Sequence, residues 1–341
     1  MSNEEDLNIN QSEDISSVGP IRPPSEANSL LVRVTKSCPW NRCEFCDVFK
    51  GKKFQLRKLE EVKQEILVAK KAMEDIQRWA DQSGYGLGYI AIQNGMPWIQ
   101  DEGVKSVFLQ DSDSLIMKVE PLVEILEFLR DTFPTLERVC SYARGKTILK
   151  KKPQELRRLR EAGLSRLHMG LETGDDELLV YIKKGANAEE MVKAGKKAIE
   201  AGFEVSEYVM PGLGGRERWE QHAKNSALVL NEINPHFIRL RTFHLLTGTP
   251  MYERAKRGEF QIQSIEGILV EVRRFIEVLN VTSELITSDY AFNYYLGGVD
   301  GKLPEDKDKL KKAVDEALRE WRSKGEPKRN PFMGSLNRSG V

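Results

Sequence analysis

The stretch LLVRVTKSCPWNRCEFC, residues 30–46, joins a short β-rich run to a loop that carries three cysteines. LLVRVT predicts a buried strand, which must end near Pro39 because proline cannot donate to a strand ladder. Cys38, Cys43 and Cys46 follow in a C-x4-C-x2-C spacing. Three soft thiolates on one flexible loop can converge on a single inorganic centre. The stretch therefore predicts a metal or cluster site directly after the first strand.

The number of ligands leaves two kinds of site open. A structural zinc ion normally has four protein ligands, and the nearest candidates for the fourth, Cys140 and His168, are far away in the sequence. A [4Fe–4S] cube on three cysteines has one iron without a protein ligand, which can bind a small molecule. The chain has four cysteines, three of them within nine residues. This clustering does not suit a disulfide framework and favours a reducing, cytoplasmic environment.

Outward from the loop, β-rich runs alternate with helical patterns. Strands are predicted at residues 30–35, 106–111, 138–143, 166–172, 203–210 and 237–243. Helices are predicted at residues 57–81, 119–132, 153–162, 175–183, 187–201, 217–232 and 265–280. Each strand is followed by at least one helix, which favours an α/β fold with a parallel sheet and right-handed crossovers. The pattern fits an open six-stranded sheet and a partial barrel equally well.

The predicted domain organisation has four parts. Residues 1–29 hold six acids and one base, and predict a disordered acidic tail. The core spans residues 30–255, a C-terminal helical extension spans residues 256–302, and a charged tail spans residues 303–341. The glycine-rich residues 83–104 are irregular, and suit a lid over the site or an ordinary surface insertion.

Composition excludes several classes of protein. The 341 residues include 52 Lys+Arg and 52 Asp+Glu, so net charge gives no reason to expect binding to nucleic acid or to an anionic membrane. No run approaches eighteen apolar residues, and the acidic N-terminus shows no secretory signal. A hydrophobic share of 40% is enough for a sizeable core. We expect a cytoplasmic globular protein.

The cysteine loop, its position after the first strand and the six strand–helix units resemble the radical SAM enzymes. Phe45 matches the aromatic residue before the last cysteine of that family, although Cys38 and Cys43 are one residue further apart than in its commonest spacing. The segment TKSCPWNRCEFCDVFKGKKF, residues 35–54, resembles a subgroup of Fe–S oxidoreductases with the same longer spacing. The resemblance implies a partial (β/α)6 TIM-like barrel of parallel strands with a helical C-terminal extension. It also implies a [4Fe–4S] cluster on Cys38, Cys43 and Cys46, with S-adenosylmethionine (SAM) as the second cofactor.

The same resemblance implies a reaction. In this family SAM is cleaved reductively to a 5′-deoxyadenosyl radical, which takes hydrogen from a substrate that the sequence does not identify. The chain would then be a radical SAM oxidoreductase or transferase that needs an external electron donor such as flavodoxin or ferredoxin. No membrane partner and no nucleic-acid partner are expected. The alternatives are a non-catalytic iron–sulfur electron carrier and a zinc-stabilised binding module.

Polar residues at the ends of the later strands are the candidate SAM contacts, because ligands collect at the carboxyl ends of parallel strands. Asp111, Ser112 and Asp113 could hold the methionine ammonium, or could form a turn that caps the next helix. Arg144 could meet the SAM carboxylate or the substrate, or form a surface ion pair. Glu172 lies in GLETG, which resembles the family's GxE[ST]G segment and implies a SAM contact. The other interpretation is a charge that complements the next helix.

Two further segments complete the candidates. Gly212 and Gly214 in PGLGG would let the backbone approach a planar ligand closely, near the adenine by resemblance, or form a plain turn. Arg239 and Arg241 share one face of the last predicted strand, where Arg241 would meet an anionic substrate or the SAM carboxylate. A buried structural ion pair is the other interpretation. Cys140 and His168 are expected to be packed side chains, and no catalytic residue is assigned.

Overall fold

The structure is a computed structural model that describes residue 19 and residues 21–324. Eight strands form one sheet in the order β1-β4-β5-β6-β7-β8-β9-β10. These strands are β1 (Leu30–Arg33), β4 (Ser106–Gln110), β5 (Arg138–Ala143), β6 (Leu164–Glu172), β7 (Glu204–Val209), β8 (Phe237–Leu240), β9 (Glu284–Ile286) and β10 (Gly301–Lys302). All neighbours from β1 to β9 pair in parallel, and β10 pairs antiparallel with β9. A short hairpin of β2 (Thr35–Lys36) and β3 (Gln55–Leu56) flanks the cysteine loop.

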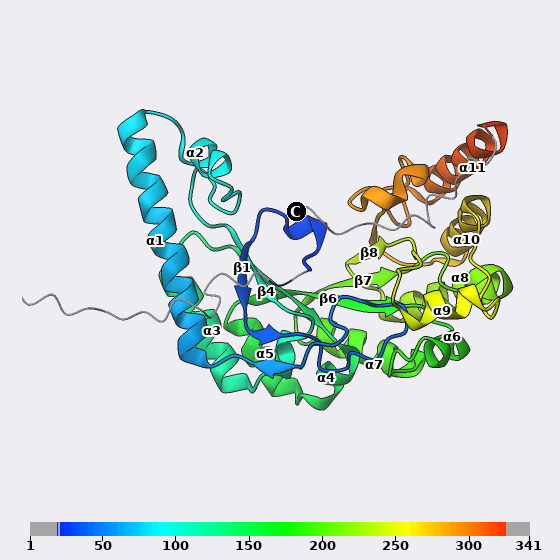
Figure 1. Cartoon of the computed structure of the whole chain (residues 1–341), viewed down its shortest axis with the longest axis horizontal. Coiled ribbons are helices and arrows are strands. Elements are labelled where there is room, and N and C mark those ends of the chain that lie inside the picture. Colours follow the sequence, from blue (N-terminus) through cyan, green and yellow to red (C-terminus); the bar gives the residue numbers. More distant parts are fainter. Residues whose placement is uncertain (1–18, 20, 325–341) are drawn as a thin grey trace, which may run out of the picture.

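Helices cover the outer face of the curved sheet (Figure 1). The α-helices of the described residues are α1 (Leu59–Ser83), α2 (Leu87–Gln93), α3 (Val119–Thr132), α4 (Gly145–Lys150), α5 (Pro153–Glu161), α6 (Asp176–Tyr181), α7 (Ala188–Glu200), α8 (Gly215–Ile233), α9 (Pro250–Lys256), α10 (Ile265–Val278) and α11 (Lys307–Lys324). The short 3-10 helices are η1 (Pro24–Glu26), η2 (Ser114–Ile116) and η3 (Ala291–Leu296). The six predicted strands correspond to β1 and β4–β8, so the partial barrel with a helical C-terminal extension is confirmed. Within the described residues, no helix is both long and apolar enough to cross a membrane.

The alternation along the strands separates an aliphatic outside from a polar inside. On β6, Leu167, Met169 and Leu171 belong to the large core that the sheet forms with its helices. His168 and Gly170, the positions between them, line a cavity inside the barrel. Successive side chains of a strand point to opposite faces, so this period-two pattern places polar groups where a ligand can reach them. The fold therefore directs the search for a site to the barrel interior.

The segment before β1 is part of the folded core, in contrast to the disordered tail predicted through residue 29. Glu26, in η1, is fully buried inside the barrel. Its carboxylate accepts a hydrogen bond from Ser29 Oγ at 2.6 Å, pairs with Arg138 at 3.2 Å and lies 3.5 Å from His168 Nε2. The sequence around Glu26 does not predict these contacts, because Arg138 and His168 lie more than a hundred residues away. The predicted tail over residues 1–18 lies outside the described residues.

Three other predicted boundaries differ from the structure. Residues 83–104 were expected to be irregular but contain α2, whose apolar side chains pack in a small cluster with Ile76 and Ile99. The segment 256–302 contains the short strands β9 and β10 as well as α10. The predicted charged tail begins with α11, which packs against α10. The rest of that tail, residues 325–341, lies outside the described residues.

Buried His168 is expected to make stability depend on pH. Burial lowers its pKa from 6.5 to about 4, against the opposing influence of the nearby Glu26. Between about pH 4 and pH 6.5, His168 is protonated in the unfolded chain but neutral in the folded chain. The contribution of His168 to stability is therefore complete above about pH 6.5 and is lost as the pH falls through this range. The dependence is about 1.4 kcal/mol per pH unit for one proton.

The test is urea unfolding of wild type and His168→Gln between about pH 5 and pH 7. We expect the variant to be less stable at pH 7 and to lose less stability than wild type on acidification. Tyr208→Phe is the control, because it removes the hydroxyl bonded to His168 but no group that titrates in this range. An equal pH slope in wild type and His168→Gln would show that the imidazole does not behave as inferred.

Candidate functional site

A cavity of about 370 Å³ lies at the carboxyl ends of the strands and holds all three loop cysteines. Its size is within the range of small-molecule sites. Four of the predicted SAM contacts also line it: Ser112, Arg144, Glu172 and Arg241. These residues follow β4, β5, β6 and β8 or end them, so the parallel sheet brings together positions more than a hundred residues apart.

Buried carboxylates fix the cysteine loop at both sides. Asp111 is fully buried and accepts hydrogen bonds from Ser37 N–H at 2.5 Å and from the Arg33 guanidinium at 2.7 Å. Glu44, between the second and third cysteines, is also buried, and pairs with Lys183 at 2.6 Å and Arg254 at 2.8 Å. These contacts connect the loop to β1, to the turn that follows α6 and to α9.

The donor set fits a cluster with three protein ligands. Cys38, Cys43 and Cys46 are partly buried and line one cavity. Burial raises the pKa of Cys43, and raises that of Cys46 to about 11, so a thiolate here requires a cationic centre to stabilise it. The fourth cysteine, Cys140, is buried beside Glu26 and His168 and does not line the cavity. Three thiols therefore face the cavity, as the cluster interpretation requires, and the described residues add no fourth.

Glu172 is held in an unusual conformation at the mouth of β6. It has φ +62°, in the left-handed region, and the β6–β7 register shifts between Gly170 and Glu172. Its Oε1 accepts a hydrogen bond from Lys184 Nζ at 2.8 Å. A Cβ on Gly170 would lie 2.1 Å from that oxygen, so the carboxylate occupies the space that the missing side chain leaves. A non-glycine residue in this region costs about 1 kcal/mol or more, and such strain tends to occur at functional sites.

The remaining candidates from the strand ends lie outside the cavity. Asp111 supports the loop as described, and Asp113 is buried with hydrogen bonds from Thr147 Oγ1 at 2.5 Å and Arg144 N–H at 3.3 Å. Burial raises the pKa of Asp113 to about 6. Gly212 donates its N–H to Glu271 at 2.9 Å, and Gly214 stands at the start of α8. Of the three neighbours Asp111, Ser112 and Asp113, only Ser112 lines the cavity.

The two predicted arginines on β8 share an acid that the sequence did not suggest. Arg241 pairs with both carboxylate oxygens of Asp289, at 2.5 and 3.1 Å, and Arg239 pairs with the same group. The Arg241 guanidinium also lies 5.0 Å from the Tyr208 ring centre and 5.1 Å from that of Tyr290. Two cations share one anion, so Arg241 is fixed in place as a partly neutralised group of the cavity wall.

Aromatic side chains form the deep end of the cavity, which we call the cavity floor: Tyr142, His168 and Tyr208. The His168 and Tyr208 rings stack with centres 5.9 Å apart, and Tyr208 OH lies 3.2 Å from His168 Nδ1. His168 Nε2 faces the Glu26 carboxylate, so this nitrogen carries the proton and Nδ1 accepts from Tyr208. Burial would raise the pKa of Glu26, but bonds from His168 and Ser29 lower it to about 2, so the carboxylate is charged.

Sequence reasoning missed two charged groups that complete the site. Lys184 lines the cavity together with Glu172 and Cys43. Burial lowers the pKa of Lys184, but the charges of Glu172 and Cys43 raise it by more, so the net shift is upward. Asp289 comes from the segment after β9. No local pattern marks Lys184, since it is one of two adjacent lysines. Only the left-handed turn after α6, with Lys183 at φ +53° and Gly185 at φ +77°, sets it apart.

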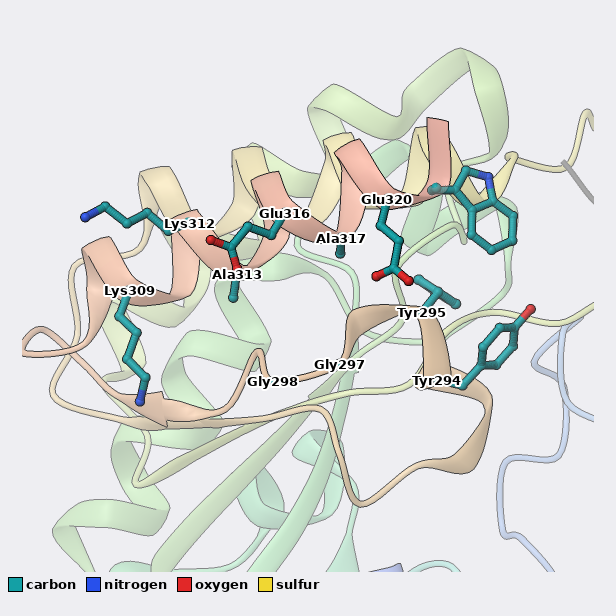
Figure 2. A pocket seen from close by; sticks show the side chains of 11 residues that line it. Tyr294, Tyr295, Gly297, Gly298, Lys309, Lys312, Ala313, Glu316, Ala317 and Glu320 are labelled. Carbon is teal, nitrogen blue, oxygen red and sulfur yellow. The ribbon is translucent and has the colours of Figure 1, made fainter. Parts of the chain in front are cut away.

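A larger hollow of about 840 Å³ lies elsewhere, between η3 and α11 (Figure 2). Ala313 and Ala317 of α11 point toward the loop that contains Gly297, and Tyr294 stands at one end. Trp321 also lines the hollow. None of the cysteines and none of the predicted SAM contacts line this hollow. Its size therefore does not make it the chemical site.

Comparison with known proteins gives a family match over most of the barrel. A model of the Radical SAM superfamily matches residues 32–225, more than half of the chain. Two curated relatives are the tRNA uridine(34) acetyltransferases of Methanocaldococcus jannaschii and Methanocaldococcus infernus. Each is 27% identical over 109 residues, which is 32% of this chain and 20% of the relative. The match thus spans only a fifth of the length of these relatives.

Solved structures show distant likeness. Elp3 of Methanocaldococcus infernus, with an N-terminal deletion, aligns with a TM-score of 0.47 at 14% identity, covering 76% of this chain and 56% of that chain. Coproporphyrinogen III oxidase (HemN) from Escherichia coli, described as a radical SAM enzyme, gives 0.47 at 17% identity, covering 73% and 52%. Methylornithine synthase gives 0.47 at 17%, covering 88% and 79%. Family membership rests on the sequence match, not on these superpositions.

Proposed function

Since this chain belongs to the radical SAM superfamily, we propose that Cys38, Cys43 and Cys46 hold its [4Fe–4S] cluster and that the adjoining cavity binds SAM. Enzymes of this family use both cofactors. When bound, the cluster supplies the electron that cleaves SAM, so that a hydrogen atom can be removed from a substrate. The observation that carries the proposal is the convergence of exactly those three thiols, with Arg144, Glu172 and Lys184, on one cavity.

The charged groups beside the thiols suit the polar end of SAM. Glu172 offers carboxylate oxygens to an ammonium group or to ribose hydroxyls. The Arg144 side chain lies over the Trp40 ring, 5.2 Å from its centre, and its guanidinium suits a carboxylate. Lys184 orients the Glu172 carboxylate through an ion pair at 2.8 Å. The sequence-based assignment of Ser112 and Arg241 as SAM contacts is retained in the proposal, because both line the same cavity.

We assign the cavity floor to the substrate. Tyr208 donates its hydroxyl hydrogen to His168, and the charged Glu26 fixes the imidazole, so the lone pairs of the Tyr208 oxygen remain available to the cavity. The floor therefore offers aromatic faces and an acceptor for a hydroxyl or amine hydrogen of the substrate. Buried walls exclude water, which protects a reactive carbon centre from unwanted hydrogen transfer. The reacting group must be small enough to share 370 Å³ with part of SAM.

The direct test is anaerobic reconstitution with iron and sulfide, followed by dithionite and SAM. We expect about one [4Fe–4S] cluster per chain, by iron and labile-sulfide analysis, and formation of 5′-deoxyadenosine. Cluster-loaded protein that binds SAM but forms no 5′-deoxyadenosine would contradict the proposed enzyme. One zinc per chain without labile sulfide would favour the binding-module alternative.

A further inference from the structure

We propose that the outer side of the cysteine loop is the docking surface for an acidic one-electron carrier protein. We call this surface the loop face and define it by Trp40, Arg42, Lys52, Lys53 and Val180. The inference rests on the proposed function in one respect, because an electron carrier is needed only if the loop holds a reducible cluster. Its evidence is separate and comes from charge, exposure and the shape of the surface.

The segment that contains the cysteine loop carries a positive net charge. Residues 36–58 contain seven Lys and Arg residues and two acids, Glu44 and Asp47, whereas the whole chain has 52 of each sign. Glu44 is buried and already paired with Lys183 and Arg254, so it does not offset the charge at the surface. Arg42, Lys52 and Lys53 are exposed. Such a patch attracts an acidic partner and steers its approach.

A hollow of about 410 Å³ is lined by Trp40 and Arg42 of the loop and by the turn that follows α6. Its apolar side chains include Leu179 and Val180, and Val180 is 77% exposed. Arg42 and Lys183 line the same hollow, and its acid, Glu190, is paired with Lys146. An apolar centre with a charged rim is the usual anatomy of a protein interface, and interfaces of electron-transfer partners are small.

Trp40 connects the hollow to the cluster site. Its side chain lines both the hollow and the cavity that holds the cysteines. Arg42, from the hollow, lies 5.0 Å from the ring centre, and Arg144, from the cavity, lies 5.2 Å from it. The indole N–H donates to Lys183 O at 2.8 Å, and a Cβ on Gly185 would lie 2.4 Å from the ring, so the wall is closely packed. A carrier in the hollow would contact the cluster loop while the cavity stays available for SAM.

The surface favours a protein over RNA, although RNA is also attracted to cations. Proteins that bind single strands combine basic grooves with aromatic faces on which bases stack. The ring at the loop face, Trp40, is covered by Arg42 and held by a hydrogen bond, while the exposed apolar contact is aliphatic Val180. RNA binding to the loop face is therefore the competing result that the test must distinguish.

The test compares two triple variants of cluster-loaded protein. Arg42→Gln/Lys52→Gln/Lys53→Gln removes charge from the loop face, and Lys71→Gln/Arg78→Gln/Lys224→Gln removes the same charge from exposed positions on α1 and α8. The primary measurement is the rate at which reduced flavodoxin, an acidic carrier, bleaches the visible absorbance of the cluster in stopped flow. Dithionite reduction and iron content report on the cluster itself.

We expect the loop-face variant to lose about tenfold or more in the second-order rate with flavodoxin, with a weaker dependence on salt than wild type. Its dithionite reduction and iron content should match wild type, and the α1/α8 variant should match wild type throughout. Val180→Asp should also slow flavodoxin, because it places a negative charge in the apolar centre.

Equal flavodoxin rates in all proteins would overturn the inference. The inference would also be overturned if the loop-face variant kept its flavodoxin rate but no longer retained tRNA on a filter. That result would show that the loop face binds RNA. Failure of SAM cleavage with dithionite would count against the proposed function alone, because flavodoxin bleaching requires only the cluster.

Discussion

Replacing Cys38, Cys43 or Cys46 with alanine is expected to abolish the [4Fe–4S] cluster and the chemistry that depends on it. The loss of a mere supporting contact around a metal site typically costs 10–100-fold, so the loss of a direct ligand should reduce 5′-deoxyadenosine formation by more than about 100-fold. The three thiols line one cavity and no other described cysteine does, so no substitute ligand is at hand. Iron, labile sulfide and 5′-deoxyadenosine should be measured on each variant after the same anaerobic reconstitution.

Cys140→Ala is the matched control for these three variants. Cys140 is fully buried in the barrel and lies beside Glu26 and His168 rather than at the cavity. We expect it to keep its iron and sulfide, with at most a modest loss of stability from the small space left behind. If Cys140→Ala lost the cluster as completely as Cys43→Ala, the assignment of ligands would be wrong.

Glu172→Gln is expected to weaken SAM binding by about 10- to 100-fold in cluster-loaded protein. A hydrogen bond to a charged group contributes about 1.5–3 kcal/mol, and 1.4 kcal/mol corresponds to a tenfold change in Kd. The variant also leaves Lys184 without its partner at 2.8 Å, which adds a positive charge beside the sulfonium-bearing ligand. Equilibrium dialysis of labelled SAM under anaerobic conditions measures the change.

Glu137→Gln provides the comparison for Glu172→Gln. Glu137 also pairs with a lysine, Lys105, at 2.9 Å, but its side chain is 69% exposed and it does not line the cavity. An exposed pair of this kind contributes little, so SAM binding and stability should stay near wild type. Equal SAM affinity in wild type and Glu172→Gln would remove Glu172 from the proposed site.

Local patterns in the sequence were sufficient to predict the barrel and the three cysteines that line its cavity. The predicted strands carry a period-two pattern or a short apolar run, as VFL in β4 does, and these signals depend only on neighbouring residues. The cysteine spacing is equally local. The short strands β9 and β10, of three and two residues, carry too few positions to show any period.

The parts that sequence reasoning missed depend on contacts between distant residues. Glu26 acquires its role from Arg138 and His168, more than a hundred residues away. Asp289 acquires its role from Arg239 and Arg241, whose partner could not be identified from the alternation on β8 alone. Asp111 and Ser112 are adjacent in sequence, yet one supports the loop and the other lines the cavity. Strand ends indicate where a site lies, but side-chain direction decides which residues reach it.

The most direct test of the account is the electron paramagnetic resonance spectrum of the reduced, cluster-loaded protein, recorded with and without SAM. Three thiolate ligands leave one iron free to bind SAM, so we expect the signal to change on addition and to show coupling to a ¹⁵N-labelled SAM amino group. A signal that stays the same at saturating SAM, with no coupling to the label, would contradict the central claim that Cys38, Cys43 and Cys46 hold a cluster open to this ligand.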